Sequence, residues 1–240
     1  MRAVILAAGK STRLHPITLD KPKCLLELEV GKTILDYQIS AIKSIGISDI
    51  IVAIGHQRDL IENHLGLAYT YHYFPEYAEF NNLHTLYSMR GNLTTPTVIF
   101  YSDVLFTPSL LKKCVDSSED FCLLVHNTSI LENTARVKIK NEGVVDVGNH
   151  ISLEESDGNF IGIAKFSKLG IVTLLNAIEH RIGDKNYNNA YYITPIGEIA
   201  KSMRVGYAFA YYEPWCEIDI LEDYERAKKE IYPKIKLSSK

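Results

Sequence analysis

The chain has 240 residues, of which 46% are hydrophobic and 23% are charged, and its formal net charge is −3. This length and composition are typical of a globular protein with a substantial core. The slightly acidic balance argues against a protein that holds nucleic acid through bulk positive charge, so we expect no nucleic-acid partner.

Targeting and membrane segments are not expected either. The apolar run at the start is short and ends at Gly9-Lys10-Ser11, whereas a secretory signal needs a longer one, and no other segment approaches membrane-spanning length. The four cysteines are scattered and form no CxxC pair. We therefore expect a reduced, cytoplasmic protein with no membrane partner and no structural metal.

Three continuous apolar runs, at residues 3–7, 50–54 and 97–101, each end in a turn and are typical of buried parallel strands. Apolar residues recur at helical spacing over 33–45, and shorter helical patterns cover 60–65 and 83–89. Strands that alternate with helices in this way indicate βαβ units. The predicted fold is therefore α/β, with a doubly wound, mainly parallel sheet.

The second half predicts a small β-rich region. Strand patterns cover 121–126, 136–140, 143–147 and 160–166, with a hairpin turn at Asn141-Glu142-Gly143. Helical patterns follow at 168–181 and 191–202, then a strand at 205–212 and a last helix at 221–231. We expect one domain over 1–240, with a nucleotide-binding half at 1–115, an acceptor and metal half at 116–232, and a frayed basic tail at 233–240.

The turn after the first strand carries the strongest chemical signal. Gly9-Lys10-Ser11-Thr12 looks like the end of a Walker A loop, but that motif needs glycine where this chain has Val4. What remains is a turn of small residues whose backbone N–H groups could cradle an anion, with positive charge from Arg13 and Lys23. The alternative is a simple tight turn with solvated basic side chains.

Several motifs together resemble the nucleotidyltransferase superfamily that makes nucleotide sugars and CDP-alcohols, in which an LAAGxGTRL-like loop precedes a Pro-Lys-x-Leu segment. The matching segments are Leu6–Leu14, Pro22–Leu25, Asn81–Leu86, Ser102–Phe106, Gly162–Phe166 and Glu217–Asp219, so they span nearly the whole chain. The resemblance implies a Rossmann-like nucleotidyltransferase fold and catalytic roles for Arg13 and Lys23. It also implies that the nucleotide is bound by Leu6, Ala7, Ala8, Gly9, Lys10, Ser11 and Thr12.

The chain departs from that family at Ser11, where the loop usually has a second glycine. If this position requires a positive φ angle, serine is less favourable there than glycine, which adopts such angles readily.

Two aspartates are the candidate metal ligands. Asp103 follows an apolar strand, and the carboxyl ends of parallel strands are where ligands bind in such sheets. The resemblance implies that Asp103 and Asp219 converge on a Mg²⁺ ion that also binds the nucleoside triphosphate. Glu217 is a weaker candidate, on the same strand face as Asp219. The alternative is that both aspartates cap helices.

The implied reaction is attack by a phosphate or phosphonate oxygen of the acceptor on the α-phosphorus, with pyrophosphate leaving. The second pKa of a phosphomonoester is about 6, so the attacking oxygen is already ionised and no general base is required.

Residues 81–87 resemble the cytidylyltransferase branch, whose members act on phosphocholine or small phosphonates. We therefore expect CTP as the nucleotide and a small phosphorylated or phosphonate acceptor. Asn81, Asn82 and Thr85 would contact the nucleotide, although the asparagines also suit a helix N-cap. Lys165, Tyr191 and Trp215 are candidates for the acceptor side, with a solvated strand lysine as the alternative for Lys165.

Two other functions stay open. The first is a nucleotidyltransferase that uses UTP or dTTP and a sugar 1-phosphate. The second is a non-catalytic nucleotide-binding regulatory protein, although such a protein would not need both Asp103 and Asp219. A homodimer is compatible with the sequence.

Overall fold

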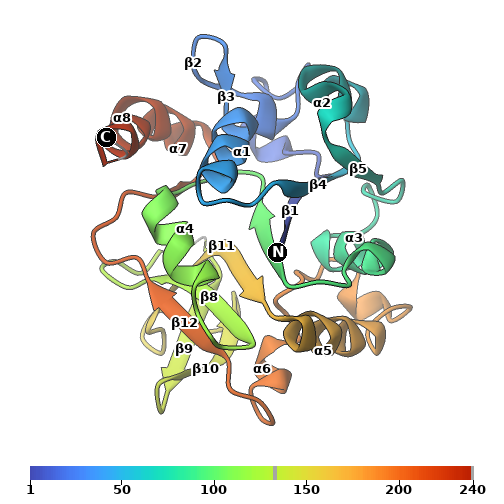
Figure 1. Ribbon diagram of the computed structural model, residues 1–240, viewed down its shortest axis with the longest axis vertical. Coiled ribbons are helices and arrows are strands. Elements are labelled where there is room, and N and C mark those ends of the chain that lie inside the picture. Colours follow the sequence, from blue (N-terminus) through green and yellow to red (C-terminus); the bar gives the residue numbers. More distant parts are fainter. Residues whose placement is uncertain (132–133, 239–240) are drawn as a thin grey trace. The chain divides into compact units, whose positions relative to one another are not determined.

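A computed structural model describes residues 1–131 and 134–238 (Figure 1). The chain forms two compact units that are interleaved in the sequence. The N-terminal unit contains Arg2–Ala78, Phe100–Lys112 and the chain from Glu213 onward, and the central unit contains Met1, Glu79–Ile99 and Lys113–Tyr212. The fold is α/β with a mainly parallel central sheet, which confirms the predicted fold class.

Three parallel strands form the sheet of the N-terminal unit, in the order β1 (Arg2–Ala7), β4 (Asp49–Ile54), β5 (Thr70–Tyr73). From Ala3 to Ile5 and from Val52 to Ile54 these strands are fully buried, as expected for apolar runs covered on both faces. The other elements of this first segment are the hairpin β2 (Glu27–Glu29) and β3 (Lys32–Thr33), the helices α1 (Ile34–Ser44) and α2 (Arg58–Leu65), and the 3₁₀ turns Thr12–Leu14, Lys23–Leu25 and Gly66–Ala68.

Two later segments, Phe100–Lys112 and the chain from Glu213 onward, return to the same unit. Strand β6 (Thr97–Tyr101) leads into β7 (Val104–Leu105), which pairs antiparallel with β13 (Cys216–Glu217). Helix α4 (Pro108–Val115) follows β7, and α7 (Leu221–Arg226) follows β13. The pairing of β7 with β13 brings two segments together that lie more than a hundred residues apart in the sequence.

The end of the chain corrects one prediction. Residues 233–238 do not form a frayed tail, because a π-helical turn (Ala227–Ile231) continues into helix α8 (Tyr232–Ser238). Ile235 is fully buried, and the ammonium of Lys236 lies 2.7 Å from a carboxylate oxygen of Glu29. These contacts with residues far away in the sequence hold a helix that the local pattern does not predict.

The central unit contains the predicted β-rich region. Its strands are β8 (Phe121–His126), β9 (Arg136–Lys140), β10 (Gly143–Gly148), β11 (Gly158–Phe166) and β12 (Gly206–Phe209). Strand β11 pairs antiparallel with β8 and β9, β10 pairs with β9, and β12 runs parallel to β8. Asn141 and Glu142 form the predicted hairpin turn, with φ angles of 51° and 57°.

The helices of the central unit are α3 (Asn82–Ser88), α5 (Lys168–Glu179) and α6 (Ile196–Ile199), with 3₁₀ turns at Arg90–Asn92 and Lys185–Tyr187. Helix α6 is much shorter than the predicted 191–202. Pro195 stands at its N-cap, and a proline lacks the N–H that a helix running through this position would require. None of the helices within residues 1–131 and 134–238 has the length and apolar content to cross a bilayer.

Candidate active site

The loop that follows β1 has an unusual backbone conformation at Ser11. Its φ and ψ angles are 54° and 39°, in the left-handed region, which costs a non-glycine residue about 1–2 kcal/mol. Two hydrogen bonds to the Ser11 carbonyl hold the conformation, from the backbone N–H of Leu14 at 3.2 Å and the hydroxyl of Thr18 at 2.9 Å. The loop therefore has the positive φ angle at this position without the glycine that is usual in the family.

The side chains around this loop divide into two groups. Leu6, Ala7 and Ala8 are buried, with exposed fractions of 8%, 4% and 6%, so only their backbone could reach a ligand. Gly9 and Lys10 are exposed, and a Cβ atom added at Gly9 would meet nothing within 4 Å. Open space beside the exposed part of the loop is what a phosphate cradle built from backbone N–H groups requires.

A second loop, Gly55-His56-Gln57 at the end of β4, supports the first. The backbone N–H of His56 donates to the carbonyl of Ala8 at 3.0 Å. A Cβ atom on Gly55 would lie only 2.7 Å from that same carbonyl oxygen, so no larger residue fits here without a shift. Sequence reasoning missed this contact. The available signal was that β1 and β4 are parallel neighbours, whose carboxyl ends meet at one edge of the sheet.

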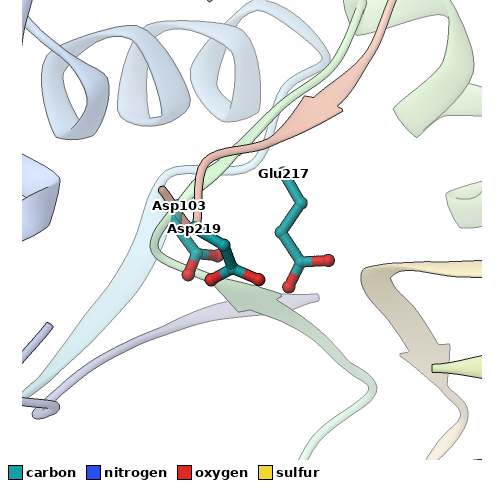
Figure 2. Close-up of side chains that lie close together, drawn as sticks. All are labelled: Asp103, Glu217 and Asp219. Carbon is teal, nitrogen blue, oxygen red and sulfur yellow. The ribbon is translucent and has the colours of Figure 1, made fainter. Parts of the chain in front are cut away.

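Three carboxylates meet at the end of the β7–β13 pair. Asp103, Glu217 and Asp219 each offer an oxygen, and the three oxygens lie within 4.8 Å of one another (Figure 2). The pairing of Glu217 with Val104 and the hydrogen bond from the N–H of Ile218 to the carbonyl of Asp103, at 3.0 Å, bring the two segments together. The structure thus unites all three predicted metal ligands.

Both predicted catalytic cations contact these carboxylates. The ammonium of Lys23 lies 2.7 Å from Asp103 Oδ2 and 3.0 Å from Asp219 Oδ1, and it also donates to the carbonyl of Ile218 at 2.5 Å. The guanidinium of Arg13 lies 2.6 Å from the same Asp219 Oδ1. Lys23 is 7% exposed, whereas the side chain of Arg13 is 59% exposed.

The electrostatics of the cluster shift two pKa values. Burial acts to lower the pKa of Lys23, but the neighbouring charges of Asp103 and Asp219 outweigh it and the net pKa is raised. Burial raises the pKa of Glu217 well above its usual range, and the negative charges of Asp103 and Asp219 raise it further. The cluster therefore combines two carboxylates that are paired with cations and a third, Glu217, whose surroundings favour the protonated form.

The helix-capping alternative is wrong for both aspartates, because other residues cap the helices. The carboxylate of Asp223 accepts the N–H groups of Asp219 and Ile220 at the start of α7, at 3.1 and 3.2 Å. At the start of α4, the hydroxyl of Thr107 accepts the N–H of Leu110 at 3.2 Å. The carboxylates of Asp103 and Asp219 therefore cap neither helix and remain available as ligands in the cluster.

The cluster fits a hard divalent cation. Asp103 Oδ1 is a buried oxygen with no hydrogen-bond partner within the described residues, and such an atom is costly unless a ligand satisfies it. Carboxylate oxygens are the ligands that hard cations prefer. Asp103 and Asp219, with Glu217 beside them, are the residues that would hold the ion.

Three further residues predicted to contact the nucleotide, Asn81, Asn82 and Thr85, lie in the central unit, in and just before α3. Asn81 caps this helix by accepting the N–H of Asn82 at 2.7 Å, and its amide donates to the carbonyl of Asn189 at 3.3 Å. The amide oxygen of Asn82 accepts the N–H of Tyr192 at 2.8 Å. The alternative of a helix cap thus holds for Asn81. Thr85 is 3% exposed, and contact of these three residues with a nucleotide stays a prediction.

The acceptor-side candidates have different surroundings. Lys165 is not the solvated strand lysine of the alternative: it is 5% exposed, and its ammonium donates to the carbonyls of Ser117 at 2.6 Å and Glu119 at 2.7 Å. Tyr191, in the central unit, is 38% exposed, and Trp215, in the N-terminal unit, is 9% exposed. An acceptor role for each stays a prediction.

The fold, the loop after β1 and the carboxylate cluster define the chain as an α/β nucleotidyltransferase. It belongs to the MobA-like NTP transferase domain family, whose match covers residues 3–136. This confirms that the chain is related to nucleotidyltransferase enzymes.

Among individual proteins, the chain is similar to CTP:phosphoglutamine cytidylyltransferase of Campylobacter jejuni, with 27% identity over 94% of this chain and 98% of that protein. It is also 37% identical to choline-phosphate cytidylyltransferase of Streptococcus pneumoniae, over 44% of this chain and 46% of the other. Among solved structures, CTP:phosphocholine cytidylyltransferase (LicC) of Streptococcus pneumoniae matches 95% of this chain and 97% of its own, with a TM-score of 0.78 and 21% identity. The inositol-1-phosphate CTP transferase of T. maritima has the same TM-score and identity, over 98% of this chain and 96% of its own.

Proposed function

We propose that the chain transfers CMP from CTP to a small phosphorylated acceptor, with Mg²⁺, and releases pyrophosphate. The observation that carries the proposal is the contact of Lys23 and Arg13 with a cluster of three carboxylates in a member of an NTP transferase family. Relatives named as cytidylyltransferases support the choice of CTP, and one of them matches over nearly its full length.

The chemistry requires positioning and charge neutralisation more than proton transfer. An oxygen of the acceptor's phosphoryl group forms a bond to the α-phosphorus of CTP, and the bond between that phosphorus and the oxygen leading to the β-phosphate breaks. A phosphomonoester acceptor has a second pKa of about 6 and is ionised near neutral pH, so no side chain has to remove a proton from it.

The residues of the N-terminal unit have separate tasks in this step. The backbone N–H groups of the loop after β1 bind phosphate oxygens, and Lys23 and Arg13 neutralise the charge that collects on the departing pyrophosphate. Asp103, Asp219 and Glu217 would hold Mg²⁺, which when bound supplies further positive charge to the polyphosphate.

The names of three relatives suggest the class of acceptor. Two are named for phosphoglutamine and choline-phosphate, and the third is a CMP-5'-(3-aminopropyl)phosphonate synthase of Streptomyces rubellomurinus, 28% identical over 50% of this chain and 20% of that protein. Each compound is small, contains nitrogen and carries an acidic phosphoryl group. We propose an acceptor of this class, in line with the phosphocholine or phosphonate expected from the sequence.

A second candidate is transfer of UMP or dTMP to a sugar 1-phosphate. It is favoured by 31% identity to UTP–glucose-1-phosphate uridylyltransferase AglF of Haloferax volcanii, over 46% of each chain. The two candidates differ in both the nucleotide and the acceptor.

A screen of pyrophosphate release separates them. The purified chain is incubated with Mg²⁺, each of the four ribonucleoside triphosphates or dTTP, and a panel of phosphocholine, aminoalkylphosphonates, phosphoglutamine and glucose 1-phosphate. We expect release with CTP and one of the nitrogen-containing acceptors. Release confined to UTP or dTTP with glucose 1-phosphate would establish the second candidate instead.

A further inference from the structure

The contacts of Lys23 use its whole hydrogen-bonding capacity. A lysine ammonium has three donors, and here they meet three acceptors, namely Asp103 Oδ2, Asp219 Oδ1 and the carbonyl of Ile218. With these bonds in place, the ammonium has no donor left for a phosphate oxygen. A role for Lys23 on the nucleotide therefore requires that it give up at least one of these partners.

Asp219 Oδ1 is shared in the same way. It accepts from both Lys23, at 3.0 Å, and Arg13, at 2.6 Å. A divalent cation held by the cluster would bind the same two carboxylates that Lys23 and Arg13 contact, and Asp103 Oδ1 is a buried oxygen with no hydrogen-bond partner within the described part of the chain. The ion and the two cationic side chains would then compete for the same two carboxylates, since like charges repel strongly at such short separations.

We propose that Lys23 and Arg13 are internal counter-ions that compete with the divalent cation for Asp103 and Asp219, and that binding of the cation releases them to the polyphosphate. This inference rests on the proposed function in taking the carboxylate cluster as the metal site. It goes further, because the same two side chains oppose binding of the metal alone and favour binding of the nucleotide. The exchange couples the two ligands, so that each makes binding of the other more favourable.

Substitutions of the two cations should therefore have opposite effects on the two ligands. The probe is Mn²⁺ alone, titrated into the 240-residue chain without nucleotide and followed by electron paramagnetic resonance or calorimetry. We expect Lys23→Met to bind Mn²⁺ at least about tenfold more tightly than the parent chain, and Arg13→Gln severalfold more tightly, since each loses a competing positive charge. The same variants should bind CTP more weakly when the metal is present.

A matched control removes a lysine–carboxylate pair elsewhere in the same unit. Lys236→Gln breaks the 2.7 Å contact with Glu29, which belongs to no part of the cluster. Its affinity for Mn²⁺ should stay at the parent value. The melting temperature of this variant, measured without Mn²⁺, shows how much a surface ion pair outside the cluster contributes to the stability of the fold.

The stability of the variants gives a second readout. Lys23→Met removes the counter-ion of Asp103 and one of the two counter-ions of Asp219, so Mn²⁺ should raise its melting temperature by more than it raises that of the parent. If Lys23→Met does not fold, Arg13→Gln decides, because the side chain of Arg13 is 59% exposed and its loss is tolerable for folding. Unchanged or weaker Mn²⁺ binding in the folded variants would overturn the inference.

The Mn²⁺ titration and the pyrophosphate-release screen test different claims, and their outcomes can be told apart. A chain that shows tighter Mn²⁺ binding in the variants but no turnover of CTP would contradict the proposed function and leave the counter-ion role intact. A chain that turns over CTP but shows no change in Mn²⁺ affinity would contradict the counter-ion role alone.

Discussion

The first prediction concerns two aspartates of the carboxylate cluster, Asp103 and Asp219. Asp103→Asn and Asp219→Asn each keep the size of the side chain and remove the negative charge that a hard cation requires. We expect each to lower kcat by about a hundredfold or more, because transition-state charge would lose its stabilisation. The measurement is pyrophosphate release as a function of Mg²⁺ concentration.

The matched control for these variants is Asp49→Asn, which removes a carboxylate from a surface ion pair with Arg2 in the same unit. Turnover by this variant should equal that of the parent. Near-parent turnover by Asp103→Asn or Asp219→Asn at limiting Mg²⁺ would remove that residue from the metal site.

The site was only partly predictable at the scale of residues. Asp103 follows from the rule that ligands bind beyond the carboxyl ends of parallel strands, because its strand is recognisable by its apolar run. Asp219 has no such local signal and was identified through the family resemblance. The ion pairs of Lys23 and Arg13 with these carboxylates were not predicted, since contacts across 80 to 206 residues depend on tertiary structure.

Among whole elements, helix α1 begins with a reciprocal cap. The hydroxyl of Thr33 accepts the N–H of Asp36 at 3.1 Å, and the carboxylate of Asp36 accepts the N–H of Thr33 at 2.9 Å. Thr33→Ala should lower the free energy of unfolding by about 1 kcal/mol, as measured in urea, with turnover unchanged. A loss of turnover without a loss of stability would contradict a purely structural role.

The same cap predicts a pH dependence of stability. Burial acts to raise the pKa of Asp36, but its hydrogen bonds to Thr33 and the contact with His64 outweigh this and lower the pKa. A carboxylate with a lowered pKa stabilises the fold above its unfolded pKa, and this contribution is lost as the pH falls through the folded value. The difference in stability between the parent chain and Asp36→Asn should therefore be largest near neutral pH and shrink in acid. A difference that does not change with pH would contradict the cap's ionic character.

The loop after β4 contacts the loop after β1 through the backbone of His56 and Ala8, so a change in the first loop should affect the second. Gly55→Ala places a Cβ atom 2.7 Å from the carbonyl oxygen of Ala8 and 2.8 Å from the Cβ atom of Tyr77, so the backbone around this contact must shift. If the loop after β1 moves, we expect the KM for CTP to rise about tenfold with a smaller change in kcat, because this loop is the proposed phosphate-binding backbone. Gly91→Ala is the control, since its Cβ atom would meet nothing within 4 Å. An unchanged KM for CTP in Gly55→Ala would show that the contact does not position the loop.

Periodicity predicted most elements and failed where long-range contacts or proline intervene. The strands at 121–126, 136–140 and 143–148 follow from their apolar patterns and the hairpin turn between the last two. Helix α6 is shorter than predicted because of Pro195, and α8 forms where no helix was expected because Ile235 packs into the core. The local sequence indicates which secondary structure a segment prefers, and tertiary packing determines which one it adopts.

At the scale of the whole molecule, the proposed function predicts that the chain prefers CTP to UTP. A pocket that hydrogen-bonds the amino group of cytosine should reject UTP, because a carbonyl in its place leaves a buried partner unsatisfied. This discrimination should be at least about tenfold in kcat/KM, which corresponds to about 1.4 kcal/mol.

The most direct test is a competition in one reaction. The 240-residue chain is given equal concentrations of CTP and UTP with Mg²⁺ and a mixture of phosphocholine, an aminoalkylphosphonate, phosphoglutamine and glucose 1-phosphate. The products are identified by mass spectrometry. A CMP adduct of one nitrogen-containing acceptor, at least about tenfold more abundant than any UMP adduct, is the predicted result. Predominance of a UMP adduct of glucose 1-phosphate would contradict it.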